Sequence, residues 1–304
     1  MRKTVLDMVC ELSKANKDIF FIGSDLSPDL LKQFKEAMPE RSFMEGISEA
    51  NLIGMAAGLA LERKIVYVNT IATFLTRRCF EQIVVDLCLH NVNVRLIGNG
   101  GGLVYAPLGP THQAIDDIGI LRTIPNMTIL APCDANEMKR LVIQTVDYKG
   151  PIYIRVAKGG DPIVSRDTLI EIGKAVLVRE GKDGLIVTTG ITLKIALEAA
   201  KELEKDGINV SVLHYHTVKP FDKEALIKYS NVPLIVSVEE HTVIGGLGGV
   251  VAEASAELGR KVKRIGIPDV FAEHYGSQES LMEEFGITKE GIVRVMKGNN
   301  KKNY

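Results

Sequence analysis

The chain has 304 residues, enough for two domains of ordinary size, and its hydrophobic fraction of 46% is typical of a folded protein with a substantial core. The formal net charge is -1, from 37 Lys and Arg against 38 Asp and Glu, so the charge balance excludes a protein built mainly to bind nucleic acid or an anionic membrane. The N-terminal residues lack the apolar stretch of a signal peptide, and no later segment is suited to span a membrane, so we expect a cytoplasmic protein.

Short β-branched runs alternate with amphipathic runs of helical period along the whole chain. This alternation predicts an α/β protein of two three-layer α/β/α domains with largely parallel sheets. In the first half, the expected strands are residues 19–22, 65–68, 94–98 and 127–130, and the expected helices are residues 49–63 and 135–148.

The periodicity lapses around Gly159-Gly160-Asp161-Pro162, where a polar connector begins. We therefore expect a first domain at residues 1–157, a linker at 158–172 and a second domain at 173–300. The strands expected in the second domain are residues 185–189, 210–214, 234–239 and 262–267. The polar tail from residue 297 is expected to fray.

The most informative segment is residues 45–60, EGISEANLIGMAAGLA. Ser48 is well placed as an N-cap, which puts Glu49 in the first turn of the following helix. That helix is rich in Gly and Ala, so another helix can approach it closely, and we expect it to be buried or intersubunit. On position alone, Glu49 would be a partner of the helix dipole.

The sequence of this segment resembles that of the pyrimidine-binding domain of transketolases and deoxyxylulose-phosphate synthases, in which the corresponding helix opens with Gly-(Ile/Val)-X-Glu. Other segments are similar to the same family in the same order and together cover nearly the whole chain. They are residues 24–26 (SDL), 73–77 (TFLTR), 80–83 (FEQI), 109–113 (GPTHQ), 125–127 (PNM), 132–137 (PCDANE) and 239–248 (EEHTVIGGLG). The chain thus resembles the C-terminal part of a transketolase, a pyrimidine-binding domain followed by the transketolase C-terminal domain.

The resemblance implies thiamine diphosphate as the cofactor. Its reactive carbanion forms when the cofactor's own amino group acts as an imine, a tautomer promoted by a carboxylic acid at the opposite ring nitrogen. The resemblance assigns that acid to Glu49, and to Phe74 the flat face on which the aminopyrimidine stacks. Asp25 matches a family residue near the cofactor at the subunit interface. Arg77 is a weaker cofactor candidate, for which a solvated or ion-paired arginine is the alternative.

On the substrate side, the resemblance implies that His112 faces the reacting carbon and can hydrogen-bond or shuttle a proton. Arg2 and Lys158 align with basic residues that hold the substrate's phosphate, although lysine lacks the bidentate fork of the arginine found in relatives.

Three departures concern the donor. Leu108 stands where transketolases carry a donor-contacting Asp, glycines around residues 100–102 stand where they place a second donor-contacting His, and Asp29 replaces a phosphate-contacting serine. A hydrogen bond exchanged for a leucine contact changes specificity strongly. We therefore expect a donor other than that of the pentose-phosphate transketolases, such as a modified sugar or a 2-oxo acid.

Thiamine enzymes hold the diphosphate and its divalent metal with a Gly-Asp-Gly motif followed by Asn, and this motif is absent; Asp183-Gly184 is preceded by Lys182. We therefore expect no metal ligands on this chain, with Mg²⁺ held instead by a partner subunit that carries the diphosphate-binding domain. The active site would lie between the chains. A heterotetramer with two copies of each chain is expected, with this chain forming a homodimer through the helix after Glu49.

The expected reaction is transfer of a two-carbon ketol-type unit from a ketose or related 2-oxo donor to an aldehyde acceptor. The alternatives are a beta-type subunit of a 2-oxo-acid dehydrogenase, a deoxyxylulose-phosphate-synthase-like subunit and a non-catalytic regulatory homologue. The GPTHQ and TFL segments favour the transketolase side over the dehydrogenase, and the presence of Glu49 and Phe74 disfavours a regulatory protein.

Four smaller features have simpler interpretations. The glycines of residues 244–249 lack the spacing of a dinucleotide fingerprint and predict tight helix packing. His214 and His216 alternate on an expected strand, and without a third ligand they predict a pair near a packing surface rather than a metal site. His241 is expected near the domain junction. The four cysteines, Cys10, Cys79, Cys88 and Cys133, have no zinc-type spacing and are expected to be buried free thiols.

Overall fold

The computed structural model describes residues 1–24 and 28–298. The first part of the chain builds a seven-stranded sheet with the order β10-β5-β6-β4-β3-β1-β2. Its strands are β1 (Ile19–Gly23), β2 (Ser42–Met44), β3 (Ile65–Ile71), β4 (Val94–Asn99), β5 (Thr128–Leu130), β6 (Ile152–Val156) and β10 (Thr217–Lys219). Strands β1 to β6 pair in parallel, and β10 runs antiparallel to β5. The central strand β4 is buried along its whole length, as expected of a parallel sheet covered on both faces.

Helices of the first domain cover both faces of this sheet. They are α1 (Arg2–Ala15), α2 (Pro28–Ala37), α3 (Glu49–Leu61), α4 (Ala72–Arg78), α5 (Phe80–Gln82), α6 (Asp117–Arg122) and α7 (Ala135–Gln144). Three shorter or irregular turns complete the set: the 3-10 turns η1 (Pro39–Arg41) and η3 (Ala106–Leu108) and the π-helical segment η2 (Ile83–Leu89).

The second domain is a five-stranded sheet with the order β12-β11-β8-β9-β7. Its strands are β7 (Val176–Arg179), β8 (Gly184–Thr188), β9 (Val210–His214), β11 (Ile235–Thr242) and β12 (Val262–Ile267). Its helices are α8 (Thr192–Lys205), α9 (Lys223–Tyr229), α10 (Leu247–Ala256), α11 (Gln278–Glu284) and α12 (Lys289–Met296). Only β7 is antiparallel, against β9.

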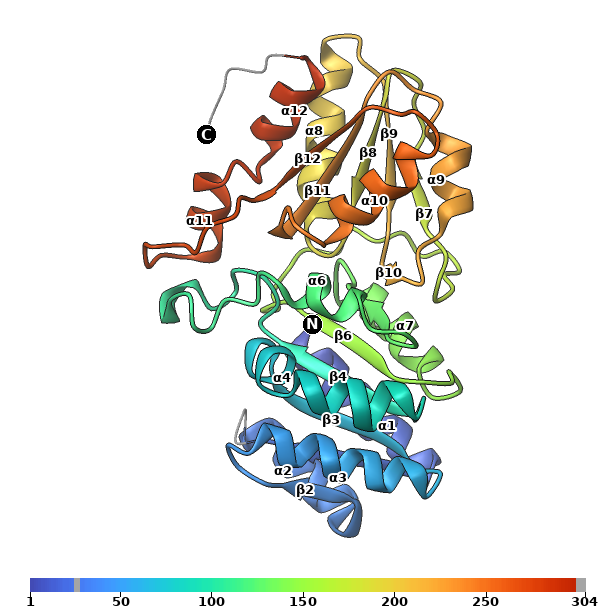
Figure 1. Ribbon diagram of the computed structural model, residues 1–304, viewed down its shortest axis with the longest axis vertical. Coiled ribbons are helices and arrows are strands. Elements are labelled where there is room, and N and C mark those ends of the chain that lie inside the picture. The colour runs from blue at the N-terminus through green and yellow to red at the C-terminus, as the bar shows by residue number, and fades with distance from the viewer. Residues whose placement is uncertain (25–27, 299–304) are drawn as a thin grey trace.

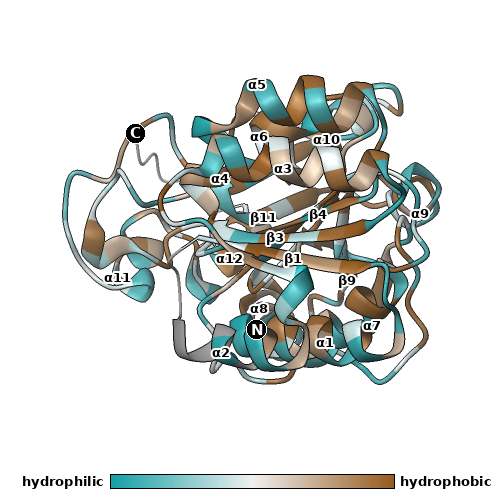
Figure 2. Ribbon diagram, turned by 90° about the horizontal axis from the view of Figure 1, so that it is seen from below, coloured by the Kyte–Doolittle hydropathy of each residue, from teal (hydrophilic) through white to brown (hydrophobic). Residues whose placement is uncertain are grey.

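The two domains are stacked along the long axis of the molecule, and the N-terminus lies near their junction (Figure 1). Seen along that axis, helices α3, α4, α5, α6 and α10 form one outer layer, and α1, α7 and α8 lie on the other side of the strands (Figure 2). Each domain has apolar clusters on both faces of its sheet. The predicted α/β class with largely parallel sheets is confirmed.

Two predicted helices end earlier than their sequence pattern suggests, at Leu61 and Gln144. Residues 157–175 contain no helix or strand. Strand β10 was not predicted; it comes from the second half of the chain yet adds an edge strand to the first sheet. All four cysteines are buried and free, as predicted. Within residues 1–24 and 28–298, none of the helices is both long and apolar enough to cross a membrane.

Candidate active site

The buried carboxylate of Glu49 lies at the start of α3. Glu49 is 3% exposed and occupies the first turn of this helix. Ser48 holds the N-cap position, but its hydroxyl donates to the carbonyl oxygen of Glu45 at 3.0 Å instead of accepting from the helix. The predicted N-cap position of Ser48 is confirmed, but its side chain does not cap the helix, because the hydroxyl is engaged by the preceding turn.

The partner of Glu49 is Arg78, which the sequence analysis did not single out. The Arg78 Nη1 donates to Glu49 Oε2 at 2.6 Å. The same guanidinium lies over the ring of Phe74, with Cζ 4.5 Å from the ring centroid. Phe74 and Arg78 are one turn apart on α4, so their side chains lie on the same face of that helix. This four-residue spacing was the one signal in the sequence that could have identified Arg78.

His112 reaches the same group from the loop after η3. Its ring meets the ring of Phe74 edge-on, with centroids 5.1 Å apart and an interplanar angle of 68°. Its Nδ1 forms a hydrogen bond with the hydroxyl of Thr111 at 2.9 Å. The fold thus links Glu49, Phe74 and His112, which are far apart in sequence: Arg78 contacts both Glu49 and the Phe74 ring, and His112 meets that ring edge-on.

Arg77 points to a different set of partners. Its Nε and Nη2 form a bidentate ion pair with Asp116, at 2.9 and 2.8 Å, and Nη2 also donates to the carbonyl oxygen of Gln113 at 2.9 Å. This is the ion-paired alternative weighed for Arg77, and a cofactor contact by this residue remains a prediction. The pairing ties α4 to the loop that carries His112.

Two polar side chains beside the predicted site residues lack partners within the described chain. They are the hydroxyl of Thr73, next to Phe74, and the side-chain amide of Gln113, next to His112; both residues are buried. Buried polar groups are normally hydrogen-bonded. Their chemistry, together with the buried acid and the aromatic ring, fits a flat heteroaromatic ligand with donor and acceptor groups.

Behind this site, a buried charged network joins the two domains. Asp117 Oδ2 accepts from the hydroxyl of Tyr153 at 2.7 Å and from Nε of Arg155 at 2.8 Å. Burial opposes ionisation, but Arg155 and the neighbouring His241 hold the pKa of Asp117 below its ordinary value. His241 Nε2 accepts from the backbone N–H of Gly119 in α6 at 3.1 Å, which confirms the prediction that His241 lies near the domain junction.

The three glycines of residues 100–102 are each required by a neighbouring side chain. A Cβ at Gly100 would lie 2.1 Å from the ring of Tyr105, one at Gly101 would lie 2.4 Å from Arg155, and one at Gly102 would lie 2.5 Å from Glu240. No histidine can therefore occupy this segment without displacing Tyr105 or the charged network. The absence of the second donor-contacting histidine is thus built into the packing.

The remaining substrate-side predictions lie in different surroundings. Leu108 is 51% exposed at the end of η3. Arg2 Nη1 donates to the hydroxyl of Tyr105 at 3.4 Å. Lys158 lines a cavity of about 310 Å³ between the residue 158–164 segment, α8 and α11. Asp25 lies outside the residues that the structure describes. Asp29 belongs to α2, but its side chain is not among those described.

The glycine run before α10 packs around a carboxylate of the chain itself. Glu239 accepts from the backbone N–H groups of Leu247 and Gly248 at 2.6 and 2.7 Å. A Cβ at Gly246 would lie only 2.1 Å from Glu239 Oε2. The start of α10 is therefore filled, which agrees with the predicted tight packing.

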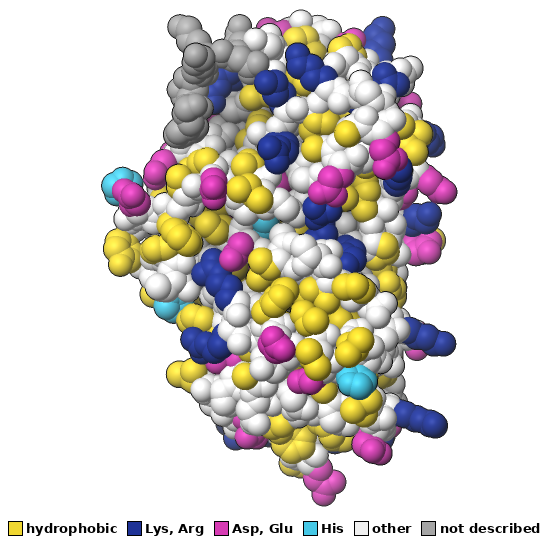
Figure 3. Space-filling view, viewed as in Figure 1, with side chains coloured by type: hydrophobic (Ala, Val, Ile, Leu, Met, Phe, Trp, Pro, Cys, Tyr) yellow, Lys and Arg dark blue, Asp and Glu magenta, His cyan; other side chains and the backbone are white. Residues whose placement is uncertain are grey.

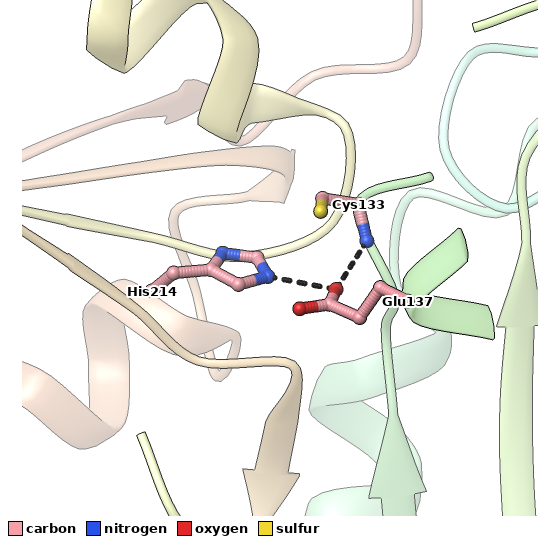
Figure 4. Close-up of side chains that lie close together, drawn as sticks. All are labelled: Cys133, Glu137 and His214. Atoms are coloured by element: carbon pink, nitrogen blue, oxygen red, sulfur yellow. Dashed lines mark hydrogen bonds and ion pairs between the residues drawn. The ribbon is translucent and has the colours of Figure 1, made fainter. Parts of the chain in front are cut away.

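His214, the last residue of β9, meets the first domain (Figure 4). His214 Nε2 lies 3.0 Å from Glu137 Oε2, which also accepts from the backbone N–H of Cys133 at 2.7 Å. Burial alone would raise the pKa of Glu137, but its contacts with His214 hold it at about 2. His216 lies beyond the end of β9, with its ring 6.3 Å from that of His214. The pair lies at a packing surface, as predicted, although the structure adds Cys133 and Glu137 as neighbours that the sequence did not suggest.

Comparison with known proteins identifies both halves of the chain. Residues 1–160 match the family described as transketolase, pyrimidine binding domain, and residues 173–292 match transketolase, C-terminal domain. The chain is 37% identical over 298 residues to the 6-deoxy-6-sulfo-D-fructose transketolase subunit of Clostridium sp. (strain MSTE9), covering 97% of this chain and 92% of that protein.

Two further matches bear on the architecture. A solved structure described as split gene transketolase, inactive beta4 tetramer, is 37% identical, with a TM-score of 0.91 and coverage of 98% of this chain and 97% of that one. The 1-deoxy-D-xylulose-5-phosphate synthase of Bacillus velezensis is 39% identical over 88% of this chain but only 43% of that protein. The chain therefore matches separate transketolase subunits over nearly their whole length and the synthase over less than half of its length.

Proposed function

This chain belongs to the transketolase family and is a transketolase-like subunit, and from that premise we propose that it forms the pyrimidine-side half of a split thiamine diphosphate enzyme. The other half is a separate chain that supplies the diphosphate-binding domain and the ligands of Mg²⁺. The assembled enzyme transfers a two-carbon ketol-type unit to an aldehyde acceptor. The observation that supports this most directly is the series of contacts that links Glu49 through Arg78 to Phe74 and Phe74 to His112.

The residues of this chain have distinct tasks in the proposal. Glu49 and Phe74 would hold the aminopyrimidine, the first by a hydrogen bond to its ring nitrogen and the second by stacking; Asp25 and Arg77 are further candidates. Thiamine diphosphate, when bound, supplies the carbanion for cleaving and forming the carbon–carbon bond. Burial of Glu49 excludes water from the hydrogen bond that it offers. His112, half-buried at the edge of the Phe74 ring, would hydrogen-bond or move a proton at the substrate oxygen.

The donor is proposed to be a ketose or related 2-oxo compound that carries an anionic group and differs from the pentose phosphates used by pentose-phosphate transketolases. Lys158 supplies positive charge in the lining of the cavity, and Arg2 supplies it beside Tyr105. Leu108 and the filled glycine segment remove two polar contacts that pentose-phosphate transketolases make. The Clostridium relative is named for 6-deoxy-6-sulfo-D-fructose, a modified ketose with an anionic group, which is compatible with this proposal.

The test is Glu49→Gln in the complex assembled with the partner chain. Because positioned acid–base groups contribute about 10²–10⁴-fold, we expect kcat for two-carbon transfer to fall by at least about 100-fold across a panel of phosphorylated, sulfonated and unmodified ketose donors. Thiamine diphosphate and Mg²⁺ should still bind, measured by calorimetry.

The matched control is Glu45→Gln, an exposed glutamate on the turn before α3, which should leave kcat unchanged. Unchanged turnover in Glu49→Gln would instead support the non-catalytic regulatory alternative. Preferred use of unmodified pentose phosphates would contradict the proposed donor class.

A further inference from the structure

Arg78 makes, within one chain, the two contacts that the proposed function assigns to the aminopyrimidine. Its guanidinium donates to Glu49 at 2.6 Å and lies over Phe74 at 4.5 Å. A guanidinium is planar, donates hydrogen bonds and stacks on aromatic faces. In these respects it resembles the ring that Glu49 and Phe74 are expected to receive.

We propose that Arg78 occupies the pyrimidine position in the cofactor-free chain and must move out before thiamine diphosphate can bind. This inference rests on the proposed function, because it assumes that Glu49 and Phe74 hold the cofactor. It concerns a residue with no assigned role, and it makes Arg78 an internal competitor of the cofactor.

The neighbouring arginine shows the difference between a fixed and a movable side chain. Arg77 is held by a bidentate ion pair with Asp116 and by the carbonyl oxygen of Gln113. For Arg78, the interactions found within residues 1–24 and 28–298 are those with Glu49 and Phe74. Its side chain is 47% exposed and comes from the last residue of α4, so it can turn into solvent without disturbing the core.

The contact between Arg78 and Glu49 also stabilises the cofactor-free chain. Glu49 is 3% exposed, and a buried carboxylate without a partner is costly. Before the cofactor arrives, Arg78 provides a charge-assisted hydrogen bond to this group. When the cofactor takes over Glu49, the arginine loses only a half-exposed ion pair and a ring contact, interactions that are individually weak.

The consequence is a measurable reduction of cofactor affinity. If the open state is only a fraction of the population, the apparent Kd equals the intrinsic Kd divided by that fraction. An open fraction of about one tenth corresponds to about tenfold weaker binding. Removing the guanidinium should remove this reduction.

The experiment uses the assembled complex with its partner chain, saturating Mg²⁺ and calorimetric titration with thiamine diphosphate. We expect Arg78→Ala and Arg78→Gln to bind about tenfold tighter than the unaltered complex, and Arg78→Lys to lie between them, since lysine keeps the charge but not the planar group. Arg179→Gln, which removes another partly exposed arginine–glutamate pair far along the chain, is the matched control and should bind normally.

A second readout does not depend on the partner. In the isolated chain, Arg78→Gln should lower the thermal midpoint, because Glu49 loses its partner, while binding in the complex becomes tighter. If the unaltered complex binds thiamine diphosphate and all three Arg78 variants bind it equally well or more weakly, this inference is overturned while the proposed function stands. If the unaltered complex binds no thiamine diphosphate, the proposed function fails, and the inference fails with it.

Discussion

Glu240 and Asp117 are both fully buried at the domain junction, yet their pKa values shift in opposite directions. Burial favours the neutral form of each carboxyl. Asp117 receives a direct ion pair from Arg155, which lowers its pKa. Glu240 Oε1 receives only neutral donors, the backbone N–H of Leu103 at 2.7 Å and the amide of Gln278 at 2.8 Å, so burial raises its pKa to about 7.

Glu240 therefore makes stability depend on pH. Its pKa is about 7 in the folded chain against an ordinary 4.5, so the folded state binds the extra proton between these values. The contribution of Glu240 to the free energy of unfolding is therefore greatest below pH 4.5, falls as the pH rises towards 7 and is constant above 7. The total loss of stability is roughly 3 kcal/mol.

Replacing Glu240 by glutamine keeps an acceptor for Leu103 and Gln278 and removes this titration. We expect the thermal midpoint of Glu240→Gln, relative to the unaltered chain, to be higher at pH 8 than at pH 5, measured by differential scanning calorimetry. The exposed Glu45→Gln should show no such difference. An equal shift at both pH values would mean that Glu240 is already ionised in the fold.

At the scale of elements, the two helices rich in glycine and alanine, α3 and α10, use their starts differently. The start of α10 is closed by Glu239, which accepts from two of its backbone N–H groups. The start of α3 instead carries a buried acid whose partner comes from another helix, α4. The first arrangement is structural and fixed, whereas the second leaves a carboxylate available for exchange between partners.

The close fit at α10 predicts a local effect of one methyl group. Gly246→Ala would place Cβ 2.1 Å from Glu239 Oε2 and 2.6 Å from His241 Nδ1. Overpacking of this kind typically destabilises by about 1–3 kcal/mol, so a lower midpoint in urea unfolding is expected. Gly249→Ala is the control, because the nearest atom to its Cβ is 3.5 Å away. Equal stability of the two variants would contradict the proposed fit.

At the scale of the whole molecule, one face of α3 meets no neighbour among residues 1–24 and 28–298. Gly54 and Gly58 are exposed, and a Cβ at either would meet no atom within 4 Å. Leu61 and Leu89 are 58% and 73% exposed near the ends of α3 and η2. Figure 3 looks onto this side of the molecule, where hydrophobic side chains lie between charged ones. These features support the proposed homodimer through α3.

A bulky residue in the middle of this face should separate the copies. Gly58→Leu adds a good helix former, and its Cβ would meet no atom of the described residues within 4 Å, so the thermal midpoint of the isolated chain should not fall. Light scattering coupled to size exclusion should nevertheless report a smaller assembly than for the unaltered chain. Lys201→Leu, on the exposed side of α8, provides the control for added hydrophobic bulk. An unchanged assembly in Gly58→Leu would place the interface elsewhere.

Much of the fold followed from local pattern. The strands β1, β3, β4, β8, β9 and β12 begin at or within one residue of the predicted positions, because buried parallel strands are short apolar runs bounded by polar turns. The ends of α3 and α7 were predicted less well, since helical periodicity continues past the last helical turn in both. Strand β10 has only three residues and pairs across domains, so no local pattern could reveal it.

The sequence by itself determined the family, the two α/β domains and the candidates Glu49, Phe74 and His112. These follow from residue type and local spacing, which can be recognised without any knowledge of tertiary contacts. Only the tertiary structure decided what those residues touch. It placed Arg78 on Glu49 and Phe74, turned Arg77 towards Asp116, and filled the space above Gly100 with Tyr105. These contacts join segments that are distant in sequence, and a side chain's partner is set by how helices and loops pack in three dimensions.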